Sequence, residues 1–305
     1  MLTSFDQGRL IGARTGTGTP WVLALHGWRR THADWDAVLG VGSADPAGPA
    51  DPAGPADPAG PADPAGPADP AGPADPAGPA DPAGPADPVR PAGHSLDAIA
   101  LDLPGFGAAP APPGAWGSAD YARAVVPVLA EMAAIAGGPV VVVGHSFGGR
   151  VAVHLGAGWP EIVGALVLSG VPHLAGVGTA GRRTAGTFHL GRALHRRGLI
   201  SDSAMEALRV RYGSADYRAA QGVMRGVLVR LVNESYEAEL AAVACPVELV
   251  WGEADTAAPL AGARAAASLL GERGRLSVCA GVGHLTPLEA PAALRSAIER
   301  HRRAS

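Results

Sequence analysis

The chain has 305 residues, 47% of them hydrophobic, a formal net charge of −4 and two cysteines. This composition is typical of a globular protein, and it excludes a disulfide-rich scaffold and a strongly basic nucleic-acid-binding chain. Charged residues interrupt positions 1–20, so we expect neither a signal peptide nor a membrane span. We predict a cytoplasmic protein with a small-molecule substrate and with neither nucleic acid nor a membrane as partner.

The first buried strand is predicted at residues 21–25, where an apolar run leads into His26-Gly27-Trp28. Gly27 has no side chain, so the backbone after this strand can fold close to the edge of a sheet. The backbone N–H of Trp28 can then face a group at that edge. A helix is predicted over residues 35–39, and the next strand over residues 96–101.

A low-complexity repeat separates this helix from the next strand. The hexapeptide Asp-Pro-Ala-Gly-Pro-Ala occurs seven times from Asp45 to residue 86. Proline at every third position matches the polyproline II turn, and such a segment cannot build a core. We therefore expect residues 45–93 to be a disordered, solvated insert, with binding of a proline-recognising partner as the alternative. The 263 residues left without the repeat are enough for one large core with a cap.

The segment from Val140 to Gly149 has the most informative pattern of the chain. Four consecutive valines predict a strand buried on both faces, and an apolar helical pattern follows Gly149. Between them, Gly-His-Ser-Phe-Gly places Ser146 where a strand turns sharply into a helix. This context is typical of a nucleophile elbow, in which a strained turn raises the serine hydroxyl above the sheet. Ser146 is therefore the candidate nucleophile.

Two later strands are each followed by a residue that could activate this serine. Residues 247–252 predict a buried strand followed by Asp255, and residues 276–280 predict a last strand followed by His284. Loops that follow parallel strands meet at one edge of the sheet. An imidazole with a pKa near roughly 6.5 can take a proton from serine, and a carboxylate can fix its tautomer.

Other titratable residues compete for these roles. Glu253 lies close to the favoured acid and remains an alternative to it, while His301 follows the acid but lies in a predicted solvated helix end. His145 and His154 flank the serine and are predicted to have packing roles. Asp102 precedes a Pro-Gly pair and is predicted to hold that turn through its side chain.

Five segments in a fixed order carry the marks of one superfamily. They are His26-Gly27-Trp28, Asp102 to Gly107, Gly144 to Gly149, Trp251 to Asp255, and Gly283-His284 followed by Pro287-Leu288-Glu289. With these marks the chain resembles the α/β-hydrolase superfamily, in particular its serine-nucleophile, cap-bearing esterases and lactonases. The resemblance covers nearly everything outside residues 45–93. It implies an α/β fold with a mostly parallel eight-stranded sheet, helices on both faces and a helical cap.

The resemblance also implies the roles of the site residues. Ser146 would be the nucleophile, His284 the general base and acid, Asp255 its orienting partner, and the backbone N–H groups of Trp28 and Phe147 the oxyanion hole. The implied reaction is hydrolysis of a small carboxylic ester or lactone through an acyl-enzyme, with no cofactor and no metal. Carbon–carbon bond hydrolases, cofactor-free haloperoxidases and a small-molecule receptor with incidental turnover remain alternatives.

The segment between the predicted strand at residues 165–169 and the strand after Cys245 would form the cap. It contains ten arginines and six acidic residues from position 173 to position 240. That balance indicates anionic substrates only weakly, because arginines on solvated helix faces are the favoured explanation. Helices are predicted at residues 202–211, with Ser201 as N-cap, and at residues 217–231.

The predicted domains divide the chain into a hydrolase core, the repeat insert and the cap. The core would comprise residues 1–44, 94–172 and 241–305, the insert residues 45–93, and the cap residues 173–240. Cys245 opens one predicted strand and Cys279 ends the next, so in a parallel sheet they should lie far apart. We expect two free thiols and a reducing compartment.

Overall fold

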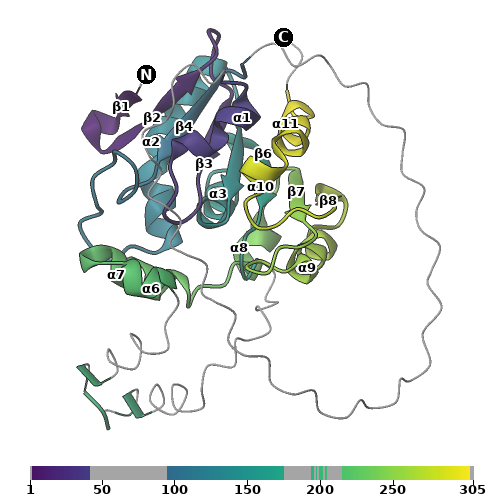
Figure 1. Cartoon of the computed structure of the whole chain (residues 1–305). Helices are drawn as coiled ribbons and strands as arrows, with labels where there is room; N and C mark the ends of the chain where they lie inside the picture. The colour runs from purple at the N-terminus through teal and green to yellow at the C-terminus, as the bar shows by residue number, and fades with distance from the viewer. Residues whose placement is uncertain are drawn as a thin grey trace, which may run out of the picture. The chain divides into compact units, whose positions relative to one another are not determined.

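One eight-stranded sheet organises the part of the chain that the computed structural model describes (Figure 1). The described residues are 2–41, 95–174 and 215–302, together with 194–195, 197, 199–201 and 203–204. The strands are β1 Leu2–Phe5, β2 Leu10–Thr15, β3 Val22–Leu25, β4 Ala98–Asp102, β5 Val140–His145, β6 Val163–Ser169, β7 Val247–Gly252 and β8 Gly274–Cys279. They lie in the order β1-β2-β4-β3-β5-β6-β7-β8.

The sheet is parallel from β4 to β8, and the pairs β1–β2 and β2–β4 are antiparallel. The α-helices are α1 Asp36–Leu39, α2 Ser118–Ala136, α3 Phe147–Gly158, α6 Ala215–Ala219, α7 Gly222–Leu231, α8 Glu237–Ala242, α9 Leu260–Leu270, α10 Thr286–Glu289 and α11 Pro291–Glu299. Short 3-10 helices cover Asp6–Gly8, His32–Trp35 and Gly271–Arg273. The predicted fold, a mostly parallel eight-stranded sheet with helices, is confirmed.

Two apolar cores cover the two faces of the sheet. Successive side chains of a strand point to opposite faces, so Val142 of β5 joins one core while Val141 and Val143 join the other. Helices α2, α3, α8 and α9 pack on the first face, and α1 and α11 on the second. Every residue of β5 is buried, which is why β-branched valines fill this central strand.

The prediction of one continuous helix over residues 217–231 is wrong. Helix α6 ends at Ala219 and α7 begins at Gly222, with Gln221 extended between them. Gly222 has a φ of +51°, a backbone conformation that favours glycine and interrupts the helical hydrogen bonds. The helix expected at residues 202–211 lies mostly outside the described residues, although Ser201 Oγ does accept a hydrogen bond from the N–H of Ala204.

The repeat lies outside the described residues, which stop at Val41 before it and resume at Ser95 after it. The N–H of Leu96 donates a 2.8 Å hydrogen bond to the carbonyl of Leu39, and Ser95 Oγ donates to the carbonyl of Gly40. These contacts join the end of α1 to the chain that enters β4. The start of β4 pairs with the start of β3, so this junction lies at the opposite end of the strands from the loops that follow them.

The chain end at α11 differs from the solvated helix end that we predicted. Arg300 donates to both carboxylate oxygens of Glu248 in β7, at 3.1 and 2.6 Å, and His301 Nε2 lies 3.3 Å from Glu248 Oε1. Glu248 is buried, and an anion inside a protein needs partners of opposite charge. Arg300 is exposed, as predicted, and His301 is half-buried, but both also contact a buried acid, which the prediction did not include.

The remaining fold predictions concern the thiols and membranes. Cys245 and Cys279 are both free, as expected from their positions at opposite ends of neighbouring strands. Within the described residues, no helix combines the length and the apolar composition needed to cross a bilayer.

Candidate active site

Ser146 occupies the turn between β5 and α3 and has a strained backbone. Its φ is +49° and its ψ −108°, in a region that non-glycine residues rarely adopt. The turn also needs glycine on both sides, because a Cβ at Gly148 would lie 2.1 Å from the carbonyl oxygen of Leu25, and one at Gly144 would lie 2.6 Å from that of Gly148. The pattern Gly-x-Ser-x-Gly is thus required by close backbone packing.

The structure brings Ser146, His284 and Asp255 together. His284 Nε2 lies 3.1 Å from Ser146 Oγ, and His284 Nδ1 lies 2.8 Å from Asp255 Oδ2. The three residues follow β5, β8 and β7, respectively. The Asp255 side chain is fully buried, and that of His284 is 28% exposed. A proton can therefore pass from the serine hydroxyl to the imidazole without rearrangement.

Backbone contacts fix the loop that carries Asp255. Its Oδ1 accepts hydrogen bonds from the N–H groups of Ala257 and Ala258 at 2.9 and 2.8 Å. The alternative acid, Glu253, is exposed and its Oε2 lies 3.4 Å from the N–H of Gly281. Of the two acids, only Asp255 contacts the imidazole of His284.

The loop that carries His284 is held by a residue to which sequence reasoning assigned no role. The carboxylate of Glu289 in α10 accepts hydrogen bonds from the N–H of Gly283 at 2.7 Å and of Leu285 at 3.1 Å. Glu289 therefore fixes the backbone on both sides of His284. The sequence signal was the Pro-Leu-Glu mark after the histidine, which gave the position of Glu289 but not its partners.

The backbone N–H groups of Trp28 and Phe147 lie where β3 and the elbow meet. The N–H of Gly148 donates a 3.0 Å hydrogen bond to the carbonyl of His26, which ties the start of α3 to the end of β3. Trp28 and Phe147 both line the cavity that contains Ser146. Among the described residues, no hydrogen bond engages either of their backbone N–H groups, so both can donate to a ligand.

The cavity at Ser146 has a volume of about 290 Å³. Its polar lining includes Ser146, His284 and Arg150, while Leu228 and Leu231 of α7 contribute apolar side chains. The described residues that line it are Gly27, Trp28, Arg30, His145, Ser146, Phe147, Arg150, Pro172, Asp216, Leu228, Leu231, Val232, Ala257, His284 and Leu285. The sequence predicted a cap that includes this segment, but it did not indicate which side chains of α6 and α7 line the cavity.

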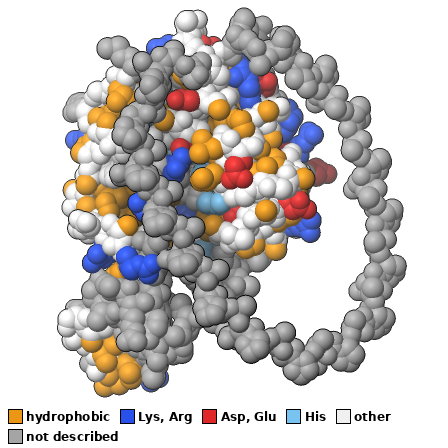
Figure 2. All heavy atoms as spheres, viewed as in Figure 1, with side chains coloured by type: hydrophobic (Ala, Val, Ile, Leu, Met, Phe, Trp, Pro, Cys, Tyr) orange, Lys and Arg blue, Asp and Glu red, His pale blue; other side chains and the backbone are white. Residues whose placement is uncertain are grey.

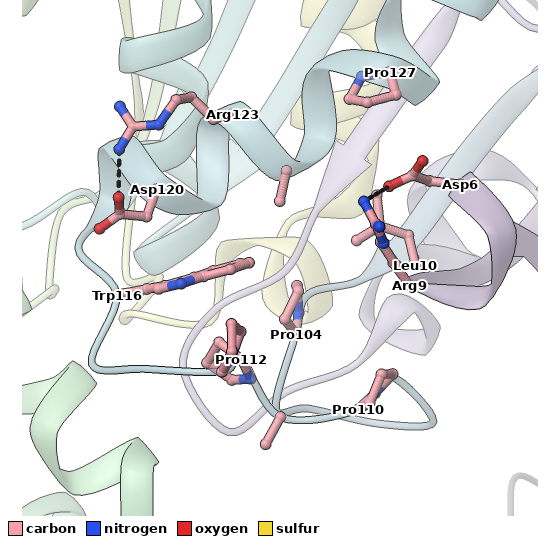
Figure 3. A pocket seen from close by; sticks show the side chains of 13 residues that line it. Asp6, Arg9, Leu10, Pro104, Pro110, Pro112, Trp116, Asp120, Arg123 and Pro127 are labelled. Carbon is pink, nitrogen blue, oxygen red and sulfur yellow. Dashed lines mark hydrogen bonds and ion pairs between the residues drawn. The ribbon is translucent and has the colours of Figure 1, made fainter.

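A larger cavity of about 610 Å³ lies elsewhere and contains none of the predicted site residues. Figure 3 shows Trp116 and several prolines around it, with two arginines at its rim. Each of these arginines is paired, Arg9 with Asp6 and Arg123 with Asp120. We therefore place the candidate active site in the smaller cavity, which has the nucleophile and its partners.

Two buried histidines support the site as neutral groups. Burial, and next the charge of His284, lower the pKa of His145 to about 3, and its Nδ1 lies 3.0 Å from Ser169 Oγ. Burial also lowers the pKa of His26, whose Nε2 accepts from the N–H of Leu103 while Nδ1 contacts the carbonyl of Gly27. Both histidines hold backbone or side-chain groups in place and carry no charge at neutral pH.

Asp102 and His154 have the structural contacts that we predicted for them. Burial raises the pKa of Asp102, but hydrogen bonds from His32 and from the N–H of Ala108 outweigh it and lower the pKa. Asp102 thereby holds the turn that follows β4. His154 Nε2 lies 3.0 Å from Ser118 Oγ, within the contact between α3 and α2. Among the described residues, no group of three or more His, Cys, Asp and Glu side chains is arranged to hold a metal ion.

Comparison with known proteins agrees with this architecture. Lipase LipV from Mycobacterium tuberculosis is 47% identical over 79 residues, which are 25% of this chain and 28% of the lipase, so the match spans less than a third of that relative. An esterase from Thermogutta terrifontis, solved with malate bound, superposes with a TM-score of 0.56 at 18% identity, covering 98% of this chain and 95% of the esterase.

Another solved structure, Est816, described as an N-acyl homoserine lactone degrading enzyme, has a TM-score of 0.57 at 19% identity, with 98% of this chain and 99% of that chain covered. At such identities the solved structures show the shared fold alone. The model of the alpha/beta hydrolase family, however, matches residues 22–297, which is most of the chain. The chain therefore belongs to the alpha/beta hydrolase family.

Proposed function

We propose that this hydrolase cleaves a small carboxylic ester or lactone through a covalent acyl-enzyme formed on Ser146. The observation that carries the proposal is the hydrogen-bonded series Asp255–His284–Ser146, with distances of 2.8 and 3.1 Å, at a strained elbow that lines a cavity. The esterase, lipase and lactone-degrading relatives support the same reaction class.

The first half of the proposed reaction forms the acyl-enzyme. Ser146 Oγ attacks the acyl carbon while His284 Nε2 takes the hydroxyl proton, and Asp255 stabilises the resulting imidazolium through Nδ1–H. The N–H groups of Trp28 and Phe147 donate to the oxyanion that forms on the former carbonyl oxygen. When the tetrahedral intermediate collapses, His284 returns the proton to the departing alkoxide.

In the second half, water repeats the attack on the acyl carbon. His284 removes a proton from the water, the same two N–H groups stabilise the second oxyanion, and Ser146 leaves with the proton that His284 donates. The products are a carboxylic acid and an alcohol, or a hydroxy acid when the substrate is a lactone. This route needs no cofactor.

We also propose the predicted division into a core and a cap. Helices α6 and α7 lie within residues 173–240, and side chains of both line the cavity at Ser146. Because most of the rest of this cavity comes from loops after β3, β5, β6, β7 and β8, the segment with α6 and α7 would set the shape of the substrate site. A volume of about 290 Å³ is suited to a small substrate.

The proposal is tested with a fluorophosphonate probe and a panel of p-nitrophenyl esters of graded acyl length, alongside lactones. The wild-type protein should be labelled at Ser146 and should hydrolyse at least one substrate. Ser146→Ala should lose labelling and at least roughly a thousandfold in kcat. The matched control is Ser268→Ala, because the Ser268 hydroxyl is exposed on α9 and bonds only within its own helix. An unreactive wild type, or an active Ser146→Ala variant, would contradict the proposal.

A further inference from the structure

Arg150 places a buried cation in the wall of the cavity that contains Ser146. It lies one helical turn after Ser146 in α3, and its N–H donates to the carbonyl of Ser146 at 3.3 Å. Its side chain lines the cavity although the residue is only 8% exposed. A buried charge is unfavourable unless it is paired or fully hydrogen-bonded, so the partners of this guanidinium decide whether it needs a ligand.

The partners that the structure provides leave the charge of Arg150 uncompensated. Nη1 donates a 2.9 Å hydrogen bond to the carbonyl of Leu231, and the guanidinium lies 5.5 Å from the centroid of the Tyr236 ring. Nε is buried and has no hydrogen-bond partner. Among the described residues, Arg150 forms no ion pair. Glu234 contacts the hydroxyl of the same Tyr236, but its carboxylate accepts hydrogen bonds from Tyr236 and Ser118 and not from Arg150.

The other arginine that lines the cavity is already neutralised. Arg30 donates to both carboxylate oxygens of Asp34, at 2.7 and 2.5 Å. The carboxylate of Asp216, which also lines the cavity, lies 3.8 Å from Arg29. Figure 2 shows basic side chains gathered over the region that α6 and α7 occupy in Figure 1. Of the two described arginines that line the cavity, Arg30 has an ion-pair partner and Arg150 has none.

We propose that Arg150 binds a carboxylate of the substrate, so that the preferred esters or lactones are acids as well. This inference rests on the proposed function. A guanidinium presents parallel N–H donors that match a carboxylate, and its charge-assisted hydrogen bonds are strong where water is excluded. Residues four apart on a helix are neighbours, about 6 Å apart along its axis. The carboxylate and the reacting carbonyl should therefore be separated by a short chain.

The inference is tested with monoethyl esters of the C5 to C7 dicarboxylic acids and with ethyl esters of the matching neutral acids. Released acid is titrated, and kcat/KM is compared within each pair. For the best pair, the wild type should have a kcat/KM at least about tenfold higher for the acidic ester than for its neutral counterpart. Arg150→Gln should bring this ratio of kcat/KM values close to one, mainly by raising KM for the acidic ester. Arg150→Lys keeps the charge but loses the paired donors, so it should keep part of the preference.

The matched control is Arg230→Gln. Arg230 lies on the same cap helix as Leu231 but pairs with Asp120 at 3.1 Å and does not line the cavity. This variant removes one positive charge and should leave the ratio unchanged. If Arg150 served only to hold α7, Arg150→Gln would lower the thermal midpoint and reduce both kcat/KM values equally, and that result would overturn the inference. A wild type without preference would overturn it too.

A binding measurement separates this inference from the proposed function and needs no variant. Glutarate should bind the wild type in calorimetry at least about tenfold more tightly than its neutral diamide. If no ester or lactone is hydrolysed but glutarate binds selectively, the carboxylate site stands and the proposed reaction fails. If esters are hydrolysed while glutarate and the diamide bind equally, the reaction stands and the carboxylate site is refuted.

Discussion

The two carboxylate oxygens of Asp255 have different hydrogen-bond partners. Oδ1 accepts from the N–H groups of Ala257 and Ala258, and Oδ2 lies 2.8 Å from Nδ1 of His284. The backbone bonds fix which oxygen faces the imidazole. The side chain therefore sets both the orientation and the tautomer of His284, with the proton on Nδ1 and the free lone pair of Nε2 directed at Ser146.

Changing Asp255 to Asn should remove activity while keeping the fold. The amide oxygen of asparagine can keep the two backbone bonds, so its NH₂ group must face Nδ1 and turn that nitrogen into an acceptor. Nε2 then carries the proton and cannot take another from Ser146. We expect kcat to fall roughly a thousandfold or more with little change in KM, measured on the best p-nitrophenyl ester.

The control for this variant is Glu253→Gln. Glu253 is the acid that the sequence left as an alternative, and it is exposed with its carboxylate near Gly281. Its removal should leave kcat within about twofold of the wild type, because surface substitutions of this kind have small effects. A large loss of kcat in Glu253→Gln together with an active Asp255→Asn would show that Glu253, and not Asp255, is the acid that acts on His284.

Gly148→Ala should disrupt the elbow. A Cβ at this position would lie 2.1 Å from the carbonyl oxygen of Leu25 and 2.7 Å from that of His26, so β3 and α3 would have to separate. We expect a loss of at least about 2 kcal/mol in the free energy of unfolding, or an insoluble protein, because overpacking against backbone is relieved only by moving whole elements.

Gly158→Ala is the same substitution at the other end of α3, where a Cβ would meet nothing within 4 Å. It should be neutral or should stabilise the protein by up to about 1 kcal/mol, because alanine is the better helix former. The two variants are compared by urea unfolding. Equal stability of the two would show that the helix tolerates separation from β3.

The candidate site was predictable because it depends on local patterns joined by one topological rule. Each of Ser146, Asp255 and His284 follows an apolar strand signal, and a parallel sheet brings the loops after its strands to one edge. The rule names the residues that meet. It gives neither the distances between their side chains nor their other hydrogen-bond partners.

What the sequence could not reveal are contacts between segments without a common pattern. Arg300 and Glu248 are 52 positions apart, and nothing in the charged end of the chain indicates that it covers a buried acid. Arg150 likewise has the pattern of any residue on the helix after the elbow, and only its depth in the cavity distinguishes it. The break at Gly222 depends on a single backbone angle, which an apolar helical pattern does not report.

Glu248→Gln should weaken the protein at neutral pH and alter its response to acid. Burial raises the pKa of Glu248, but the close contact of His301, the hydrogen bonds from Arg300 and the charges of both outweigh burial and lower the pKa to about 2, against 4.5 for the free side chain. The unfolded chain therefore binds more protons between these values. The stabilisation is complete above about pH 4.5 and is lost as the pH falls towards 2.

The expected loss in Glu248→Gln at pH 7 is roughly 2 kcal/mol, below the full conversion of the pKa shift because Arg300 and His301 are partly exposed. Urea unfolding at pH 7, 5, 4 and 3 should show the gap between wild type and variant narrowing below pH 4.5. Glu299→Gln is the control, because the Glu299 side chain is 38% exposed and pairs with Arg295 within its own helix. A gap that stays constant with pH would contradict the role of Glu248.

Deleting residues 45–86 should leave turnover nearly intact. The N–H of Leu96 bonds to the carbonyl of Leu39 at 2.8 Å, so the two ends of the connection already lie side by side. A shortened connection therefore has only a short distance to span. Shortening the connection about fivefold favours folding by about 1 kcal/mol, because the entropy of closing a loop depends on the logarithm of its length. The junction lies at the end of β4 away from Ser146, so kcat/KM should change less than about twofold. A deletion variant that unfolds at or above the wild-type temperature but loses kcat/KM more than about tenfold would show that the repeat contributes to the substrate site.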